Sequence, residues 1–406
     1  MPSLTKFGLT LAAVVALAAC SSTPKPPVLD PAQVQRFEAQ GYPGAAPVTR
    51  SEAQDMAWVQ GLPARLVWTW PQRPGPHPLV VCLPGLGQGP EALAAWRQSL
   101  AEAGYVVLSW QVLGEDETPL RGDAFALRER FGVGLLQARL DRAVALLQAL
   151  RSGAIRLPST DVQADVQHMA VLGYGLGAQT AQALAGEQVV GVRPGADWAE
   201  ATSGVRAWVF VSPFASFAQG SLDTRFRTIR QPVLVLTSDA DQDATGQVGS
   251  PYLRTAAYAG LGSTDKALLL LHGATHGDLG QRDAQDPLSG AGAQSGLSGQ
   301  RPPEGAAGRG RSGGGGMGRS GPGGGGSGGG PGGAGPGGPG DEGPGGAGEN
   351  SPTKRAMQQQ ALRTASVAFL DAHLGSDAVA RRWMAQSAAR WVEPVGEWLT
   401  APPLAR

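Results

Sequence analysis

The stretch Ala170-Val-Leu-Gly-Tyr-Gly-Leu-Gly-Ala-Gln179 decides the fold of this chain. The apolar run from His168 to Leu172 is typical of a buried strand. Glycine then recurs at every second position over residues 173–177, and glycine adopts backbone conformations that other residues avoid. The residues from Ala178 to Glu187 favour a helix. The stretch therefore predicts a strand, a sharp turn and a helix in direct succession.

Strands and helices alternate on both sides of this stretch. Apolar residues in helical phase predict helices after Gly89, over 124–152, from Pro352 to Gly375, and over 377–391. Short apolar runs predict further strands at 66–70, 78–83, 105–110, 205–212, 232–237 and 266–271. Such alternation predicts an α/β fold, in which a mostly parallel sheet carries helices on both faces.

Composition narrows the class of protein. The chain has 406 residues, with 33 basic and 33 acidic side chains and a net charge of zero. A nucleic-acid partner would require a basic surface, so we expect no nucleic acid to bind. The length suffices for one α/β domain of ordinary size. Cys82 lies within an apolar strand, where cysteine is typically a small buried hydrophobic residue.

The N-terminus has the pattern of a targeting segment. Lys6 precedes the apolar run from Phe7 to Ala19, which is shorter than the roughly 18 residues of a membrane-spanning helix. The run ends in Leu17-Ala-Ala-Cys20, which resembles the lipobox of bacterial lipoproteins. An ordinary signal peptide with an unrelated cysteine is the alternative.

The lipobox resemblance implies a signal peptide over residues 1–19 and a lipid anchor on Cys20. Ser21, rather than aspartate, follows the cysteine, which by the same resemblance implies the outer membrane of the cell envelope, with the domain facing the periplasm. Residues 20–48 are rich in Pro, Ser and Ala, and we expect the lipidated cysteine and a flexible tether there.

Residues 281–351 have a different composition from the rest of the chain. They contain long runs of Gly, Pro and Ser and almost no large apolar side chains. Such a segment buries too little surface to offset its ordering entropy, and it lacks the strict three-residue period of a collagen helix. We expect a disordered insertion within one domain, formed by residues 49–280 and completed by helices in 352–406.

The glycine turn also matches a catalytic pattern with one departure. A strand, a sharp turn and a helix form the setting of the nucleophile elbow, G-x-S-x-G. Gly173 and Gly177 occupy its outer positions, and Gly175 stands where the serine would be. The turn is therefore predicted without its attacking oxygen.

Three further features fall at matching places along the chain. The loop Pro84-Gly-Leu-Gly87 follows a strand, acidic residues follow the strand at 232–237, and His276 follows the strand at 266–271. The order elbow, acid, base is that of α/β-hydrolases. With the elbow, these features resemble the α/β-hydrolase family over about residues 62–280 and the last helices, and most of all its small esterases and dienelactone-hydrolase-like members.

The resemblance implies a role for each position. Gly175 is the vacant nucleophile position, His276 the base, and Asp241 the best match for the acid, with Asp239 and Asp243 as alternatives. The backbone N–H groups of Leu86 and Leu176 would form the oxyanion hole. Pro84 departs from the family, which often has histidine there.

Two other motifs match this region incompletely. Gly173-x-Gly-x-x-Ala178 matches a dinucleotide-binding fingerprint, but several strands precede it and residues 189–193 lack the acid that this fold needs. Asp239, Asp241 and Asp243 mimic a calcium loop, but Ala244 and Ser250 stand where that loop requires glycine and glutamate. We therefore expect no cofactor and no metal.

Three functions are compatible with a missing nucleophile. The first is an ester or acyl hydrolase descendant, impaired in covalent catalysis, that still binds a small acyl or ester ligand. The second is an active hydrolase in which His276 and Asp241 activate a water molecule. The third is a non-catalytic binding or interaction protein of the cell envelope.

Overall fold

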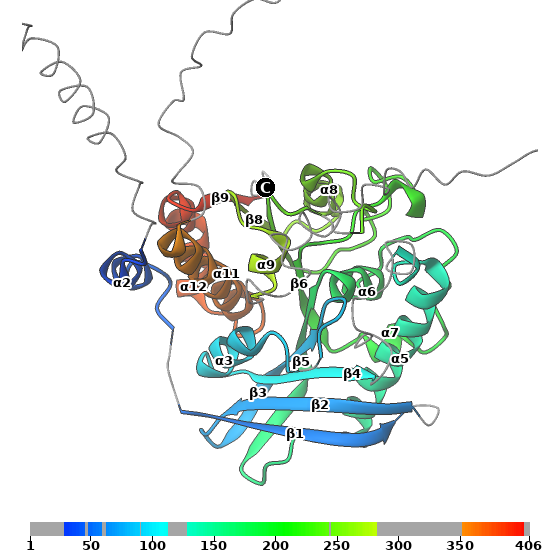
Figure 1. The fold of residues 1–406 in the computed structure, drawn as a ribbon. Coiled ribbons are helices and arrows are strands. Elements are labelled where there is room, and N and C mark those ends of the chain that lie inside the picture. Colours follow the sequence, from blue (N-terminus) through cyan, green and yellow to red (C-terminus); the bar gives the residue numbers. More distant parts are fainter. Residues whose placement is uncertain are drawn as a thin grey trace, which may run out of the picture.

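The computed structural model describes residues 28–44, 48–58, 62–89, 91–112, 128–242, 245–281 and 351–401. The predicted signal peptide, Cys20, Asp243 and nearly all of the predicted insertion lie outside these ranges. The described residues form one nine-stranded sheet in the order β1-β2-β4-β3-β5-β6-β7-β8-β9 (Figure 1). Helices pack against both faces of the sheet, so the α/β fold predicted from the sequence is confirmed.

The centre of the sheet is parallel and its edges are antiparallel. Strands β4, β3, β5, β6, β7 and β8 run parallel to one another, whereas the pairings β1–β2 and β2–β4 at one edge and β8–β9 at the other are antiparallel. The strand bounds are Thr49–Trp58 (β1), Leu62–Pro71 (β2), Gly75–Leu83 (β3), Val106–Val112 (β4), Val162–Tyr174 (β5), Val205–Val211 (β6), Val233–Ser238 (β7), Lys266–Leu271 (β8) and Gly396–Thr400 (β9).

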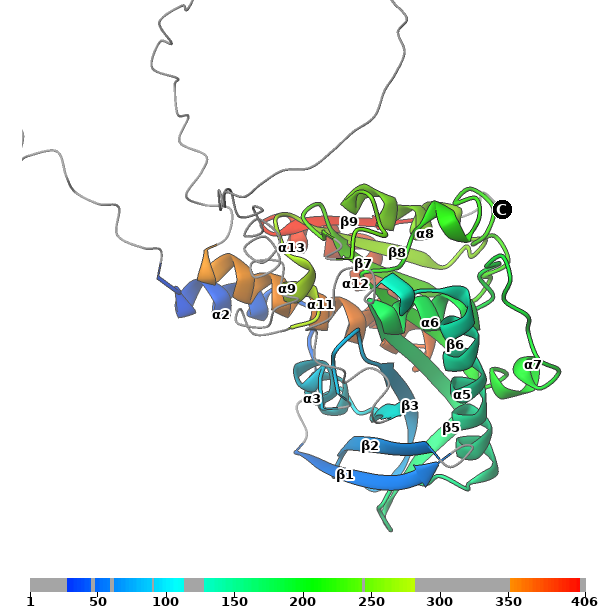
Figure 2. The same ribbon diagram turned by 45° about the vertical axis from the view of Figure 1, so that its right-hand side comes forward.

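Alternate side chains of the central strands face two apolar layers. Val80 and Cys82 face α3 and α11, whereas Leu79 and Val81 face α5 on the opposite side (Figure 2). Cys82 is a free, buried thiol, as predicted. The helix bounds are Pro31–Ala39 (α2), Ala94–Glu102 (α3), Val133–Ser152 (α5), Leu176–Leu184 (α6), Trp198–Ala201 (α7), Thr255–Gly260 (α8), His276–Leu279 (α9), Pro352–His373 (α11), Ala378–Gln386 (α12) and Ala388–Val392 (α13).

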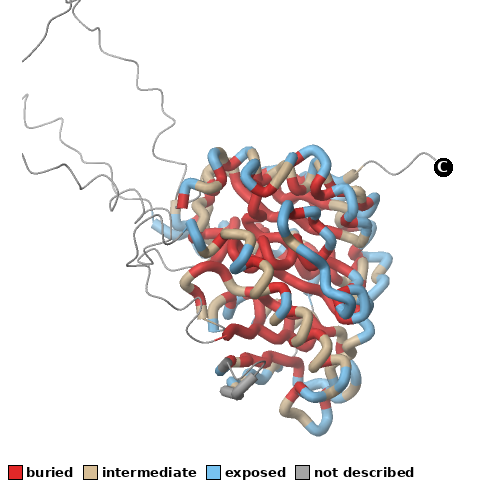
Figure 3. Tube along the Cα trace, turned by 90° about the vertical axis from the view of Figure 1, so that its right-hand side faces the viewer, coloured by how far each residue is buried: buried red, intermediate tan, exposed pale blue. Residues whose placement is uncertain are grey.

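The central strands are buried along most of their length, as the burial map shows (Figure 3). The helix after the predicted insertion, α11, contributes Leu362, Phe369 and other apolar residues to the same layer as α3. Residues on both sides of 282–350 therefore belong to one packed unit. Among the residues that the structure describes, no helix combines the length and apolar character needed to cross a bilayer.

Two predicted helices have different bounds. The helix predicted over 124–152 is interrupted: Arg128 and Glu129 are helical, a turn follows, and α5 begins at Val133, because Gly132 is extended and acts as its N-cap. Residues 124–127 lie outside the described ranges. The helix predicted over 377–391 is divided at Ser387 into α12 and α13. The break brings Trp383 and Trp391 together with ring centroids 5.4 Å apart, so packing overrides local helix propensity.

The prediction of a flexible tether over residues 20–48 is wrong for 28–44. Asp30 caps α2, which Pro31 opens. The Phe37 ring stacks on Trp391 with centroids 4.5 Å apart, and the Trp391 indole N–H donates to the Phe37 carbonyl at 2.8 Å. Tyr42 donates to the Asp371 carboxylate at 2.9 Å. This N-terminal arm is thus held against α11 and α13 by an aromatic pair, one buried hydrogen bond and one partly buried hydrogen bond.

Candidate functional site

The glycine turn has the backbone of an elbow. Strand β5 ends at Tyr174 and helix α6 begins at Leu176, so a single residue, Gly175, makes the connection. Gly175 has φ +53° and ψ −108°, a conformation that L-residues with side chains rarely adopt. Its N–H donates to the Val211 carbonyl of β6 at 3.0 Å. The predicted succession of strand, sharp turn and helix is confirmed.

The outer glycines of the turn are required by close packing. A Cβ atom at Gly173 would lie 2.3 Å from the Gly177 carbonyl oxygen, and one at Gly177 would lie 2.0 Å from the Leu83 carbonyl oxygen. Both distances are far below van der Waals contact. Helix α6 can therefore sit directly against the ends of β3 and β5 only with glycine at these positions.

The central glycine has a different environment. A Cβ atom at Gly175 would lie 3.4 Å from His276 Nε2 and 3.5 Å from His276 Cε1. Apart from its chain neighbours, no other heavy atom of the described residues comes within 4 Å of that position. Unlike positions 173 and 177, position 175 has room for a side chain, and that side chain would point at an imidazole.

His276 is fixed by a short helix at the end of β8. It opens α9, where Thr275 and Asp278 form a reciprocal capping box. The His276 carbonyl accepts a hydrogen bond from the Tyr174 hydroxyl at 2.8 Å. Arg355 of α11 pairs with Asp278 at 2.9 Å, so three elements hold the histidine backbone in place.

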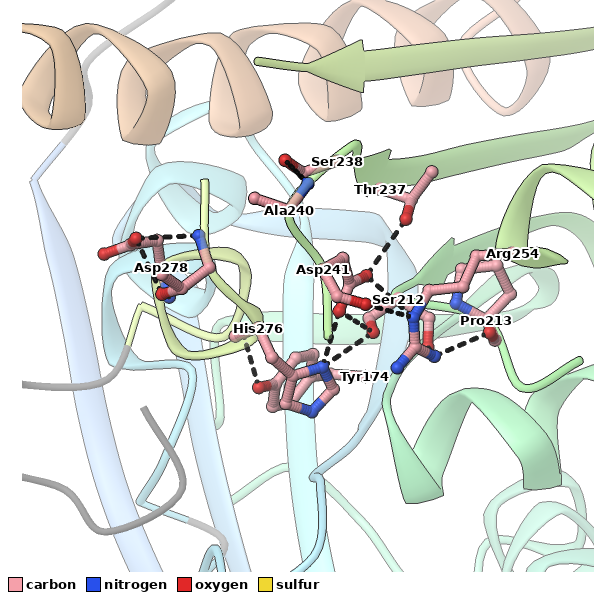
Figure 4. A network of polar contacts seen from close by, with 11 residues as sticks. Tyr174, Ser212, Pro213, Thr237, Ser238, Ala240, Asp241, Arg254, His276 and Asp278 are labelled. Carbon is pink, nitrogen blue, oxygen red and sulfur yellow. Dashed lines mark hydrogen bonds and ion pairs between the residues drawn. The ribbon is translucent and has the colours of Figure 1, made fainter. Parts of the chain in front are cut away.

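A buried carboxylate lies behind the imidazole (Figure 4). His276 Nδ1 is 2.8 Å from Asp241 Oδ1, and that oxygen also accepts from Ser212 Oγ at 3.0 Å. The other oxygen, Asp241 Oδ2, accepts from Thr237 Oγ1 at 2.9 Å and lies 3.1 Å from Arg254 Nε. Oδ1 therefore has two hydrogen-bond donors, whereas Oδ2 has one donor and an ion pair with Arg254, whose Nε–H donates to the Asp241 backbone carbonyl at 3.1 Å.

The charge of this carboxylate is stabilised despite its burial. The Asp241 side chain has no exposed surface, and that of Arg254 is only 3% exposed. Burial acts to raise the Asp241 pKa, but the Arg254 charge and the hydrogen bonds from His276 and Ser212 outweigh it, and the pKa falls below its ordinary value. Asp241 is therefore ionised at neutral pH.

The protonation state of Asp241 determines the imidazole tautomer. An ionised carboxylate only accepts hydrogen bonds, so His276 Nδ1 must carry the hydrogen. In the neutral ring the lone pair then lies on Nε2, the atom nearest to the Cβ position of Gly175. The arrangement can withdraw a proton from a group bound at that position.

The structure separates the alternative acids. Asp239 accepts hydrogen bonds from His272 Nδ1 at 3.0 Å and from the Gly273 N–H at 2.7 Å, so it braces the loop after β8 rather than His276. Asp243 lies outside the described residues. Of the described aspartates in this loop, Asp241 is the one that contacts His276.

The two predicted oxyanion donors lie beside the turn. Leu86 and Leu176 belong to one apolar cluster, together with Phe131, Phe214 and Val248. Leu176 is the first residue of α6, and the N–H groups of a first helical turn have no acceptor within the helix. The loop of Leu86 is held by Gln88, whose side-chain oxygen accepts from the Gly85 N–H at 3.0 Å.

Three residues of the site were not predicted with a role. Ser212 and Thr237 are the last residues of the strands predicted over 205–212 and 232–237, and Arg254 lies in no predicted element, so none of the three has a sequence pattern that indicates its role. Ser212 follows β6, Thr237 belongs to β7, and Arg254 ends the 3₁₀ helix η2 (Pro251–Arg254). Ser212 and Thr237 come together because the ends of the neighbouring parallel strands β6 and β7 share one edge of the sheet, and η2 brings Arg254 to the same carboxylate.

Comparison with known proteins supplies no relative. No protein-family model matches the chain, and a search of curated proteins returned no match. Within the described ranges, no group of three or more His, Cys, Asp or Glu side chains is arranged to hold a metal ion.

Proposed function

We propose that this chain is an α/β-hydrolase-like protein whose site binds an ester or other acyl compound but does not perform covalent serine catalysis. The observation that carries the proposal is the 3.4 Å between the Cβ position of Gly175 and His276 Nε2. An elbow after β5, an acid after β7 and a base after β8 agree with the order of that family's catalytic groups.

The binding mode follows from the groups around the turn. The ligand carbonyl oxygen would accept from the Leu176 N–H at the start of α6, beside Leu86, and the acyl chain would lie against the cluster that includes Phe131 and Phe214. A triad enzyme without its nucleophile keeps only about 10³- to 10⁴-fold catalysis over water. A bound ester would therefore be turned over slowly or not at all.

A second candidate is hydrolysis by water, favoured by the open space at position 175. A water molecule there could donate a hydrogen bond to His276 Nε2. In that reaction Nε2 takes a proton from water, and the oxygen attacks the acyl carbon. The tetrahedral intermediate collapses as the imidazolium returns the proton to the departing alkoxide.

Replacing His276 with alanine distinguishes these candidates. With p-nitrophenyl butyrate as the probe, water activation predicts slow hydrolysis that falls by about 10²-fold or more, the contribution typical of a general base. Ligand binding alone predicts no hydrolysis above background in either protein, together with a rise in melting temperature when the ester is added.

His272→Ala is the matched control, because His272 contacts Asp239 rather than Asp241. It should leave both the rate of ester hydrolysis and the ester-induced rise in melting temperature unchanged. If wild type neither hydrolyses short esters nor is stabilised by them, the proposal fails and a non-catalytic interaction protein becomes the better account.

We also propose that the protein is attached to a membrane of the bacterial cell envelope through acyl chains on Cys20, on the strength of the lipobox pattern. Cys20→Ser should then move the full-length protein from the membrane fraction to the soluble fraction, and metabolic labelling with radioactive palmitate should be lost. Cys82→Ser is the control, because Cys82 is buried in the sheet. Retention of both label and membrane association by Cys20→Ser would contradict the proposal.

A further inference from the structure

The conformation of Ser212 is unusual for a residue with a side chain. It directly follows β6, is fully buried, and has φ +53°. Its N–H donates to the Leu236 carbonyl at 2.7 Å, and its carbonyl accepts from Arg254 Nη1 at 3.3 Å. Left-handed residues other than glycine persist where the surroundings fix them. Here the backbone contacts direct the hydroxyl to one place.

That place is between the acid and the base. Ser212 Oγ lies 3.0 Å from Asp241 Oδ1 and 2.9 Å from His276 Nδ1. The carboxylate can only accept, so the serine hydroxyl donates to it and its oxygen lone pairs face Nδ1. The Nδ1 hydrogen is thus shared by two acceptors, the Asp241 oxygen and the Ser212 oxygen.

We propose that Ser212 is a positioning residue, whose hydroxyl fixes the His276 ring so that Nε2 stays aimed at position 175. In a triad the nucleophile hydroxyl holds the Nε2 side of the ring, but Gly175 has no side chain. The Tyr174 ring packs against the imidazole with centroids 5.0 Å apart, but no described residue makes a hydrogen bond to Nε2, so hydrogen bonds orient the ring from the Nδ1 side alone. A single hydrogen-bond acceptor at Nδ1 leaves the imidazole ring able to rotate, whereas two acceptors define the plane of the ring.

A purely structural role would be simpler: the hydroxyl would only satisfy one lone pair of the buried Asp241. The two roles predict different results when the hydroxyl is removed. A structural role lowers stability and leaves the ring in place. A positioning role alters the ring itself, through the Nδ1 hydrogen, and lowers kcat with little change in KM.

Two variants separate the hydroxyl from the backbone strain. Both variants remove the hydroxyl. Ser212→Ala keeps a side chain at positive φ, whereas glycine in Ser212→Gly adopts that φ freely. Ser216→Ala is the control, because Ser216 caps η1 (Phe217–Gln219) and does not contact His276. Each variant is made in full-length protein with wild-type Gly175 and also with Gly175→Ser.

The first readout is the NMR signal of the His276 Nδ1 hydrogen in ¹⁵N-histidine-labelled protein, which does not depend on hydrolysis. We expect a far-downfield signal in wild type that moves upfield or broadens in both Ser212 variants and not in Ser216→Ala. An unchanged signal in folded Ser212→Ala and Ser212→Gly would overturn the proposal, whatever the activity of the protein.

The second readout is kinetic and rests on the proposed function. With Gly175→Ser, removal of the Ser212 hydroxyl should lower kcat for p-nitrophenyl butyrate by roughly 10- to 100-fold, the scale expected for a misaligned catalytic group. An unchanged kcat would also overturn the positioning role. If Gly175→Ser gives no esterase at all, the proposed function fails, and the NMR signal alone decides the role of Ser212.

Discussion

Replacing Gly175 with serine is expected to raise esterase activity by about 10³-fold or more, since removing the nucleophile from a triad enzyme costs about 10⁶-fold in kcat. The new Cβ would lie 3.4 Å from His276 Nε2, which places the hydroxyl within hydrogen-bond reach of the base. A side chain at φ +53° costs about 1–3 kcal/mol, so the variant should melt at a lower temperature. Hydrolysis of p-nitrophenyl acetate and butyrate measures the gain.

Gly175→Ala is the matched control for this experiment. It introduces the same Cβ and the same backbone strain but no oxygen, so it should lose stability like the serine variant and gain no activity. Adding His276→Ala to Gly175→Ser should abolish the gain. Equal activity of the serine and alanine variants would mean that hydrolysis does not pass through residue 175.

Replacing Arg254 with methionine is expected to destabilise the protein by about 3–5 kcal/mol at neutral pH, the range measured when one partner of a buried ion pair is removed. The change leaves the Asp241 carboxylate buried without its cation, and Arg254 also donates to the carbonyls of Ser212 and Pro213. Denaturant unfolding of both proteins measures the difference. Arg382→Met, at an exposed position on α12, should change stability by less than about 0.5 kcal/mol.

The loss of stability caused by Arg254→Met should depend on pH with a definite sign. In wild type the Asp241 pKa is lowered in the folded state, so its stabilisation is present above the ordinary value of 3.8 and is lost as the pH falls through the folded pKa. Without Arg254, burial dominates and raises the folded pKa, so the variant carboxyl takes up a proton more readily on folding. The deficit should therefore shrink between pH 7 and pH 4. A constant deficit would show that the lost hydrogen bonds, rather than the lost charge, cause it.

Local sequence patterns were sufficient to predict the central parallel strands and the glycine turn. Strand β8 has the predicted bounds, Lys266 to Leu271, because a continuous apolar run flanked by polar residues marks a strand buried on both faces. Gly175 and His276 could be placed because each follows such a strand. Asp241 could be preferred over Asp239 only by register, which the hydrogen bonds to His276 now support.

Features that depend on distant partners could not be predicted. Strand β1 is largely polar and lies at an edge of the sheet, so it lacks the apolar run that marks a central strand. The N-terminal arm is folded because Phe37 meets Trp391, residues that are remote in the chain. Ser212 and Arg254 reach Asp241 from separate elements, and no local pattern distinguishes them from other serines and arginines.

The most direct test of the central claim is covalent labelling of Gly175→Ser with a fluorophosphonate, read by mass spectrometry of the peptide that contains residue 175. The serine oxygen attacks phosphorus and fluoride departs only if His276 Nε2 faces that oxygen. We predict stoichiometric labelling of residue 175 in Gly175→Ser, and none in wild type or in the double variant with His276→Ala. An unlabelled residue 175 in folded Gly175→Ser would contradict the account, because base and elbow would then not share one site.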